Sequence, residues 1–399
     1  MSRAIILVMD SFGIGGAPDA EKFGDLGADT LGHIIDSYPD LNIPNLVKLG
    51  LIKAANEASG SNRILSEEKA EIDINSAYGH CKEISLAKDT SSGHWELAGV
   101  PIETPWGYFK PDYPSFPDEL IDNICKKAGL SGILGNKAAS GTEIIKELGE
   151  EHIRSGKPIC YTSVDSCFQI AAHEKYFGLE NLYKVCEIAF NELTPYRIAR
   201  VIARPFIGES SNSFVRTKNR HDYSVTPPKK TLLDIVKESG RDVIAIGKIS
   251  DIYAGCGVSK KVLASGLDEL WDKTLSEVKE AADNSLIFTN FVDFDMLYGH
   301  RRDVKGYAES LEYFDTRLPE LASVLRDNDV VFIVADHGND PTAKGTDHTR
   351  EQVPVLMFGK KVVPGNIGQR DSFADVGQSV ADVLGLKIEK GISFYRRAE

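Results

Sequence analysis

Six side chains of the types that bind transition metals lie along this chain, several of them in pairs. They are three aspartates and three histidines, namely Asp10, Asp295, His300, Asp336, His337 and His348. Carboxylate oxygens and imidazole nitrogens together suit zinc, manganese or iron, whereas calcium prefers a cage of oxygen ligands alone. The residue types therefore predict a two-metal site.

Two of these aspartates follow apolar segments. Asp10 comes directly after residues 4–9, and Asp336 comes directly after residues 330–335. If both segments are parallel strands, the two carboxylates meet at the carboxyl edge of the sheet, where open α/β sheets bind their ligands. A single aspartate in such a position often only caps a helix, so neither residue indicates a metal site by itself.

The histidines make this interpretation more specific. His300 follows Asp295 by five positions, and His337 directly follows Asp336. His348 lies eleven positions after His337, in a polar segment. Three imidazoles close to carboxylates in the sequence favour a metal site. The alternative is that these histidines lie on the surface in polar loops.

The segment of residues 87–97 contains a candidate nucleophile. Thr90, Ser91 and Ser92 stand in a row before Gly93 and a helical pattern. A loop that enters a helix in this way presents backbone N–H groups, which favour a bound phosphate. A hydroxyl is a weak nucleophile until a base or a metal lowers its pKa. Thr90 is the nucleophile we expect, and a simple helix cap is the alternative interpretation.

Composition bounds the class of protein. The length of 399 residues predicts about two or three domains, and 42% hydrophobic with 26% charged residues is typical of a globular protein. A formal net charge of -13 argues against a nucleic-acid partner. The apolar runs are too short for a signal peptide or a membrane helix. Six scattered cysteines indicate reduced thiols, so we expect a cytoplasmic protein. Nothing indicates an obligate protein partner.

Short apolar runs alternate with helical patterns, which predicts an α/β fold with a mostly parallel sheet between layers of helices. The expected strands are residues 4–9, 243–246, 286–292, 330–335 and 353–358. The expected helices between them include residues 231–239, 267–282 and 305–327.

Two irregular stretches interrupt this alternation. Residues 101–117 are rich in proline and aromatic residues, and residues 205–229 contain a Ser/Asn cluster and a Pro-Pro pair. We therefore expect residues 101–221 to form a smaller α+β cap domain, inserted into a discontinuous metal-binding core of residues 1–100 and 222–399. The cap is expected to lie over the metal edge of the sheet.

Taken together, these motifs resemble those of the prokaryotic phosphopentomutases, a family of the alkaline phosphatase superfamily, over nearly the whole chain. The segments that carry the resemblance are Asp10-Ser-Phe-Gly-Ile-Gly, Lys88-Asp-Thr with Gly93-His-Trp-Glu, Gly247-Lys-Ile-Ser-Asp-Ile, Asp336-His-Gly-Asn-Asp-Pro and Thr346-Asp-His-Thr-Arg-Glu. The metal motifs alone fit several members of the superfamily. The Lys88 and Gly247 segments narrow the resemblance to this family.

The resemblance implies interconversion of ribose 1-phosphate and ribose 5-phosphate, and of the 2-deoxyribose pair. It implies two Mn²⁺ ions, a phosphothreonine at Thr90, a sugar bisphosphate intermediate, and glucose 1,6-bisphosphate or ribose 1,5-bisphosphate as activator. Carried over by position, one ion would be bound by Asp10, Asp336, His337 and the Thr90 hydroxyl. The other would be bound by Asp295, His300 and His348.

A sugar phosphate also needs contacts away from the metals. Arg204, Arg220 and Lys248 are the phosphate anchors we expect, because guanidinium forks bind phosphate in a bidentate manner and lysine binds it as a point charge. Ser163 and Asp165 are expected to contact sugar hydroxyls from the cap.

Three other functions stay open on the sequence alone. A metal-dependent phosphatase or phosphodiesterase of the same superfamily would release phosphate without needing a bisphosphate. A metal-dependent phosphoglycerate mutase would act on a phosphorylated acid, usually with a serine nucleophile. A non-catalytic metal-binding or scaffold protein belongs to a different class, and the intact ligand set and Thr90 segment argue against it.

Overall fold

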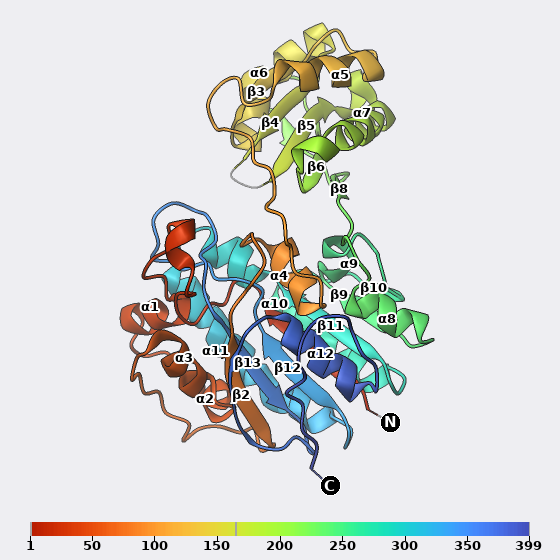
Figure 1. Cartoon of the computed structure of the whole chain (residues 1–399). Coiled ribbons are helices and arrows are strands. Elements are labelled where there is room, and N and C mark those ends of the chain that lie inside the picture. The colour runs from red at the N-terminus through yellow and green to blue at the C-terminus, as the bar shows by residue number, and fades with distance from the viewer. Residues whose placement is uncertain (1, 164–165, 399) are drawn as a thin grey trace. The chain divides into compact units, whose positions relative to one another are not determined.

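A computed structural model describes residues 2–163 and 166–398 of the chain (Figure 1). The chain forms two compact units. The first, called the core unit here, comprises Met1–Thr104 and Thr226–Glu399, and the second, the insertion unit, comprises Pro105–Val225. The expected cap boundaries, residues 101 and 221, lie a few positions before the observed ones.

The core unit is built on an eight-stranded sheet with the order β10-β9-β11-β1-β12-β13-β2-β14. Its strands are β1 (Ala4–Met9), β2 (Ser76–Cys81), β9 (Val243–Ile246), β10 (Lys260–Val262), β11 (Leu286–Phe291), β12 (Val330–Val334), β13 (Val353–Phe358) and β14 (Gly365–Arg370). All neighbouring strands pair in parallel except that β13 runs antiparallel to both β12 and β2. The central strands β1, β11 and β12 are buried along their whole length, as expected for a parallel sheet covered on both faces.

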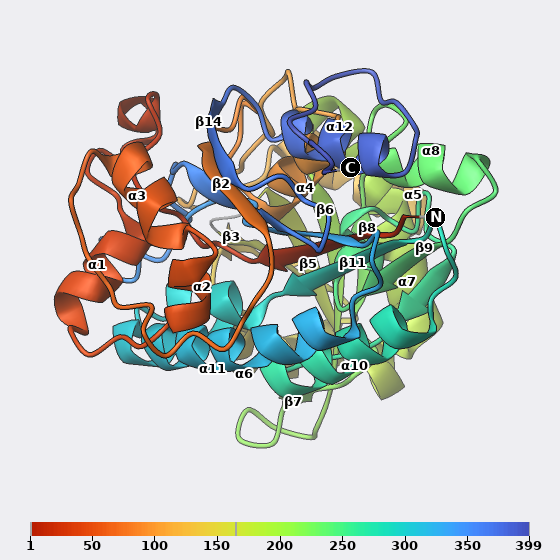
Figure 2. The same cartoon turned by 90° about the horizontal axis from the view of Figure 1, so that it is seen from below.

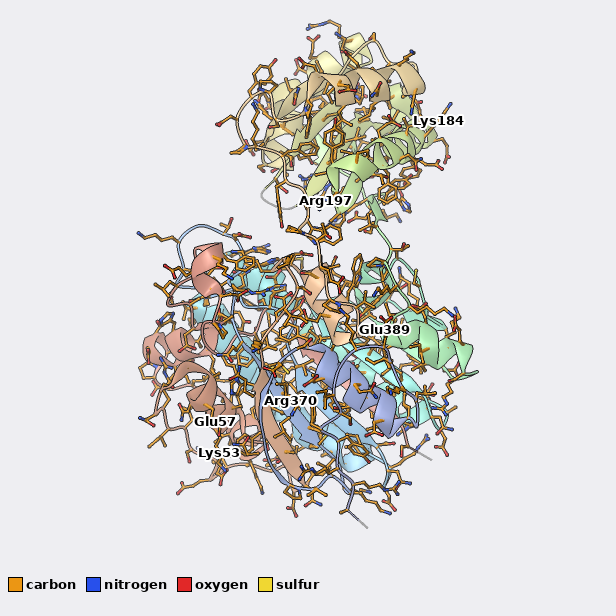
Figure 3. The ribbon with its side chains drawn as sticks, viewed as in Figure 1. Lys53, Glu57, Lys184, Arg197, Arg370 and Glu389 are labelled. Carbon is orange, nitrogen blue, oxygen red and sulfur yellow. The ribbon has the colours of Figure 1, made fainter. Side chains whose placement is uncertain are left out.

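Helices cover both faces of this sheet. They are α1 (Thr30–Ser37), α2 (Pro44–Lys48), α3 (Leu51–Ser59), α4 (Thr90–Leu97), α8 (Leu232–Glu238), α9 (Ile249–Ile252), α10 (Leu267–Glu280), α11 (Val304–Val324) and α12 (Ala374–Val383). Figure 2 shows α10 and α11 on one face and α8 and α12 on the other. Charged side chains such as Lys53 and Glu57 of α3 are exposed on the outside (Figure 3).

The insertion unit has its own sheet, with the order β3-β4-β5-β6-β7 and β8 paired to β6. Its elements are α5 (Asp118–Ala128), β3 (Leu134–Ala138), α6 (Gly141–Ser155), β4 (Ile159–Thr162), β5 (Cys167–His173), α7 (Leu179–Glu192), β6 (Arg200–Ile207), β7 (Val215–Arg216) and β8 (His221–Ser224). An apolar cluster that includes Phe168 packs α5 and α7 on one face of the sheet. A second cluster that includes Tyr161 packs α6 on the other face.

The expected α/β architecture is confirmed, and so are most of the expected elements. The sequence patterns missed β2, because Ser76–Cys81 contains glycine and polar residues and no continuous apolar run. In the sheet, β2 lies between β13 and β14, where pairing on both sides compensates for its weak intrinsic preference. No helix in the described part of the chain is both long and apolar enough to span a membrane.

Candidate metal centre

The strand register brings the two strand-terminal aspartates together. β1 pairs in parallel with β12, and Val8 lies opposite Val334. Asp10 and Asp336 therefore occupy matching positions just beyond the two strands. Both carboxylates are buried. The arrangement expected from the two apolar segments is the one that the structure has.

Asp10, Asp336 and His337 form a first group whose ligand atoms lie within 4.8 Å of one another. Nε2 of His337 lies 3.5 Å from Oδ1 of Asp10 and 3.3 Å from Oδ2 of Asp336. Oδ1 of Asp10 has no hydrogen-bond partner among the described residues. A buried carboxylate oxygen without a donor is costly unless a cation binds it, so this group fits a metal ion.

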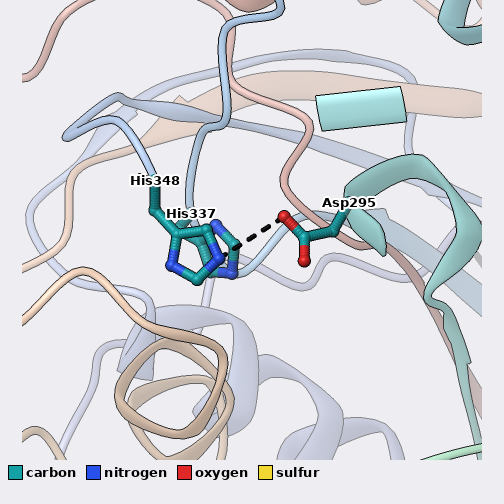
Figure 4. Close-up of side chains that lie close together, drawn as sticks. All are labelled: Asp295, His337 and His348. Carbon is teal, nitrogen blue, oxygen red and sulfur yellow. Dashed lines mark ion pairs between the residues drawn. The ribbon is translucent and has the colours of Figure 1, made fainter. Parts of the chain in front are cut away.

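Asp295, His337 and His348 form a second group within the same distance (Figure 4). Asp295 lies in a short π-helical turn after β11, Phe294–Gly299, and its Oδ1 is 3.4 Å from Nε2 of His348. Nε2 of His300 lies 3.1 Å from Oδ2 of Asp295 and 3.2 Å from Nε2 of His348. All six predicted ligands therefore meet in one place. His337 belongs to both groups, whereas the family resemblance assigned it to one ion.

Burial and mutual charge shift the pKa values in this cluster in opposite directions. Burial raises the pKa of Asp10 well above its usual value, and the neighbouring carboxylates of Asp336 and Asp295 raise it further. Burial also opposes the charges on Asp336 and His337. Their mutual attraction is stronger, so the pKa of the Asp336 carboxyl is lowered and that of the His337 imidazole is raised. Three buried carboxylates are thus only partly balanced by imidazoles, which suits divalent cations.

Asn290 and Asn339 orient two of the predicted ligands, and neither was expected from the sequence. Nδ2 of Asn290 donates to Oδ2 of Asp10 at 2.9 Å. Nδ2 of Asn339 donates to Oδ1 of Asp295 at 2.7 Å. Asn290 stands in the otherwise mostly apolar strand β11, and this isolated amide was the signal that could have revealed it. Such partners fix the direction of a ligand's lone pairs.

Thr90 begins α4, and its hydroxyl faces the centre. Oγ1 of Thr90 lies 3.3 Å from Nε2 of His337. Asp89 is the N-cap of α4 and forms a capping box with Ser92. The backbone N–H groups of Ser91 and Ser92 donate to Oδ1 of Asp89 at 3.0 and 3.3 Å. The Asp89 carboxylate therefore already accepts from two of the N–H groups at this helix start, and the phosphate expected there stays a prediction.

Gly93 and His94 hold α4 against the end of β12. A Cβ atom at Gly93 would lie 1.9 Å from the backbone oxygen of Asp336, so the helix reaches this position only because residue 93 has no side chain. Nδ1 of the buried His94 lies 2.9 Å from the Thr90 carbonyl oxygen and 3.0 Å from Oδ2 of Asp336. The two residues fix the start of α4, where Thr90 lies, relative to a predicted metal ligand.

The residues expected to contact the sugar phosphate are divided between the two units. Lys248 is exposed at the end of β9 in the core unit. Arg204 and Ser163 lie in the insertion unit, where Nε of Arg204 donates to Oε1 of Gln169 at 3.0 Å. Asp165 lies outside the described residues.

Arg220, the remaining expected anchor, already has an anionic partner. Its Nε and Nη2 atoms donate to the two carboxylate oxygens of Asp222, both at 2.6 Å. A bidentate pair of this kind neutralises the guanidinium, so Arg220 presents less free charge to a phosphate than its position in the sequence suggested.

This arrangement of buried aspartates and histidines at the end of a mostly parallel sheet is that of a metal-dependent enzyme. A family model described as "Metalloenzyme superfamily" matches residues 2–388. A phosphopentomutase from Elusimicrobium minutum (strain Pei191) is 64% identical over 397 residues, which cover 99% of this chain and 100% of the relative. A phosphopentomutase from Aeromonas salmonicida (strain A449) is 59% identical over 403 residues, with 99% and 100% coverage. The chain therefore belongs to the metalloenzyme superfamily and, within it, to the phosphopentomutase family.

Two other enzymes are among the solved structures that match this chain. A phosphoglycerate mutase from Leishmania mexicana has a TM-score of 0.46 at 13% identity, covering 99% of this chain and 97% of that one. The alkaline phosphatase from the Antarctic bacterium TAB5 has a TM-score of 0.37 at 13% identity, covering 97% and 98%.

Proposed function

We propose that this protein interconverts ribose 1-phosphate and ribose 5-phosphate, and the corresponding 2-deoxyribose phosphates. The observation that carries the proposal is the position of the Thr90 hydroxyl. It lies 3.3 Å from His337, the residue that the two ligand groups share. Relatives that match the chain over almost its full length are named phosphopentomutase, which supports the same activity.

The chain provides ligands for two ions, which we propose to be Mn²⁺. One would be held by Asp10, Asp336, His337 and the Thr90 hydroxyl, and the other by Asp295, His300 and His348. When bound, divalent ions neutralise phosphate charge and favour the ionised form of a nearby hydroxyl. The mixed oxygen and nitrogen donor set favours Mn²⁺ over the harder Mg²⁺.

Thr90 is the group that we propose to carry the phosphoryl group. A sugar bisphosphate, glucose 1,6-bisphosphate or ribose 1,5-bisphosphate, first transfers one phosphoryl group to its Oγ1. The new P–O bond forms as the P–O bond to the sugar breaks, the sugar monophosphate leaves, and the proton of the Thr90 hydroxyl passes to the departing sugar oxygen. The phosphothreonine then transfers this group to a hydroxyl of the sugar monophosphate and produces a bisphosphate. The bisphosphate turns around and returns its other phosphate to Thr90. Phosphoryl transfer depends mainly on positioning and charge neutralisation, so the way His94 and Gly93 hold the start of α4 is part of the mechanism.

Two groups of residues stay predicted substrate contacts. Arg204, Arg220 and Ser163 in the insertion unit, together with Asp165, are proposed to bind the sugar phosphate, and Lys248 in the core unit is proposed to bind phosphate. None of these side chains belongs to the metal cluster, so their role is recognition of the substrate.

One assay tests the proposal against its alternatives. The purified protein with Mn²⁺ is given ribose 1-phosphate, with and without a sugar bisphosphate, and ribose 5-phosphate and free phosphate are measured. We expect ribose 5-phosphate to form, faster with the bisphosphate, while free phosphate stays near background. Release of phosphate as the main product would indicate a phosphatase. Conversion of phosphoglycerate in place of the pentose phosphate would indicate the other mutase.

A further inference from the structure

The guanidinium of Arg302, two positions after the predicted ligand His300, contacts several of the segments that surround the metal centre. One of its acceptors is Oδ1 of Asn339. The others are backbone carbonyl oxygens at distances of 2.7 to 3.0 Å, those of Gly299, Asp340, Gly345 and Asp347. A planar guanidinium has five N–H donors in a fixed arrangement, so it holds these segments in one geometry.

The contact with Asn339 reaches a predicted metal ligand. The Asn339 amide accepts from Arg302 through Oδ1, and its Nδ2 donates to Oδ1 of Asp295 at 2.7 Å. Arginine has only donors, so it keeps the amide oxygen on its own side and turns the NH₂ group toward the carboxylate. A Cβ atom at Gly299 would lie 2.8 Å from Nδ2 of Asn339, so the amide also packs closely against the turn that carries Asp295. Arg302 therefore determines which end of the amide meets the ligand.

A second route runs through the loop of residues 344–347, whose side chains are exposed. Nδ1 of His300 donates to the Thr346 carbonyl oxygen at 2.6 Å. This hydrogen bond places the proton on Nδ1, so Nε2 is the nitrogen that can accept a cation. The carbonyl groups on either side of Thr346 accept from Arg302. The guanidinium therefore fixes the acceptor that orients His300.

The backbone of Arg302 is also unusual. Its φ angle is 57°, in the left-handed region that residues with a side chain avoid. Such a conformation persists where the surrounding contacts compensate for it, and it is common at functional sites. Here the carbonyl oxygen of Gly299 accepts from both the backbone N–H and Nη1 of Arg302. The turn directly after the predicted ligands is thus closed by the backbone and the side chain of one residue.

Charge and orientation predict opposite effects of Arg302 on a bound cation. Burial lowers the pKa of the Arg302 guanidinium, and nearby carboxylates, that of Asp295 among them, oppose this shift. A positive group near a cation site repels the cation, so by charge alone the removal of Arg302 would tighten metal binding. Orientation has the reverse consequence, because the loss of a partner behind a ligand weakens metal binding by about 10–100-fold.

We propose that Arg302 is a positioning residue for the second of the two proposed ions. It orients Asp295 through the amide of Asn339. It orients His300 through the loop of residues 344–347. The proposal rests on the two-ion centre of the proposed function, and it assigns Arg302 no contact with the ion or with the substrate.

Titration of the metal-free full-length protein with Mn²⁺ tests this role without any need for turnover. Isothermal titration calorimetry measures the affinities, and elemental analysis after dialysis measures the bound metal. In Arg302→Met we expect one ion to bind as in the wild type and the other to bind about 10–100-fold more weakly. Arg301→Met removes the same charge from the adjacent exposed residue, and we expect wild-type binding. Unchanged or tighter binding of both ions in Arg302→Met would overturn the proposal.

Combination with ligand variants identifies the ion that Arg302 affects. In Asp295→Asn, which lacks a ligand of the second ion, Arg302→Met should not change the affinity for the remaining ion. In Asp10→Asn, which lacks a ligand of the first ion, it should weaken the remaining ion by about 10–100-fold. Weakening of the remaining ion in the Asp295→Asn background would indicate a general loss of structure and would overturn the proposal.

Two further variants separate orientation from charge and from folding. Arg302→Lys keeps the charge but loses the planar fork, so we expect the second ion to stay weakened. If circular dichroism shows that Arg302→Met does not fold, Arg302→Lys provides the same comparison. Asn339→Ala removes only the amide route, so we expect a smaller loss of affinity for the second ion than in Arg302→Met. Wild-type affinity for the second ion in either variant would overturn the proposal.

The titration and the mutase assay can fail separately. If the wild type binds two ions but does not convert ribose 1-phosphate, the proposed function fails and the titration still decides the role of Arg302. If the wild type is active and Arg302→Met binds both ions with wild-type affinity, only the role of Arg302 fails.

Discussion

Among the three consecutive hydroxyl residues before Gly93, the structure gives Thr90 a distinct environment. Ser92 is buried, and its Oγ accepts from the backbone N–H of Asp89 in the capping box. The Thr90 hydroxyl instead lies 3.3 Å from His337. The structure therefore confirms a helix cap in this segment, formed by Asp89 and Ser92, and the nucleophile interpretation of Thr90 stays a prediction.

Thr90→Ala is expected to abolish mutase turnover, because no other described hydroxyl takes its place beside His337. Thr90→Ser should keep measurable activity, since the oxygen remains. Ser91→Ala is the matched control, and we expect a mild effect. After incubation with a sugar bisphosphate, peptide mass mapping should locate one phosphate on Thr90. A label on Ser91, or normal turnover in Thr90→Ala, contradicts the assignment.

Removal of metal is expected to abolish activity, because the buried carboxylates of Asp10, Asp295 and Asp336 need cations to balance them. Mn²⁺ should restore turnover better than Mg²⁺, since imidazole ligands disfavour the harder ion. Elemental analysis should find about two ions per chain in the wild type, because the predicted ligands form two groups. It should find fewer ions per chain in Asp10→Asn. Full activity in protein shown to be metal-free would exclude the two-metal centre.

At the scale of elements, Arg350 connects the loops around the metal centre. Its buried guanidinium donates to Oε2 of Glu83 at 2.6 Å and to the carbonyl oxygen of Ala87 at 2.8 Å. It also donates to both carboxylate oxygens of Asp19 at 3.1 Å. The Ala87 carbonyl lies just before the Thr90 segment, so this side chain ties the loop before α4 to loops from distant parts of the sequence.

Arg350→Met is expected to destabilise the protein by about 3–5 kcal/mol, because it leaves the buried Glu83 carboxylate without its partner. Urea denaturation measures this change. The double variant with Glu83→Gln should recover part of the loss, since the uncompensated charge is gone. Equal stability of the single and double variants would mean that the ion pair itself contributes little.

The contact between α11 and α2 depends on one buried carboxyl group, Asp315. Its oxygens accept from the backbone N–H groups of Asn45 and Leu46 at 3.2 and 2.7 Å. Burial raises the pKa of Asp315 to about 6, and these hydrogen bonds lower it only in part. Because the folded protein binds this proton more tightly than the unfolded chain, the raised pKa contributes to stability. The contribution is complete below the usual pKa near 3.8, and it is lost as the pH rises through about 6.

Comparison of wild type with Asp315→Asn should reveal this pH dependence. Between about pH 4 and pH 7 the wild-type free energy of unfolding should fall relative to the variant by up to about 3 kcal/mol. Urea denaturation at several pH values measures the difference. Asp327→Asn, at an exposed carboxylate paired with Lys360, is the control and should show no such trend. A constant difference between wild type and Asp315→Asn would contradict the raised pKa.

For the whole molecule, the insertion unit has the features of an independently folding domain. Both of its apolar clusters consist of residues between Phe109 and Tyr223, so its core needs no side chain from the core unit. The chain enters it through a segment without helix or strand between Val100 and Asp118, and leaves it after β8. Segments of this kind are preferred sites of proteolysis.

Limited proteolysis should therefore cut first within residues 101–117 or 208–229, and leave fragments that match the two units. Mass spectrometry of the early fragments identifies the sites. A chain consisting of residues 105–225 alone should unfold cooperatively in urea. Early cuts inside β1 or β12, or a 105–225 fragment without cooperative unfolding, would contradict two separate units.

Sequence alone determined the ligand types, the fold class and the Thr90 segment, because these depend on local patterns: an apolar run that ends in aspartate, a helical period, and a row of hydroxyls before glycine. That the predicted metal ligands lie close together could be foreseen from the sequence, because parallel strands bring their carboxyl ends to one edge, whatever the exact register.

Only the tertiary structure decided which side chains support that site. The chain brings together in three dimensions the partners of Asn290, His94 and Arg350. The same is true of the two ligand groups that share His337, and of the ion pair between Arg220 and Asp222. The hydrogen bond from Arg302 to Asn339 depends on the same kind of tertiary packing. Local pattern does not encode such pairings, because the register and the packing of the helices set the distances between residues far apart in sequence.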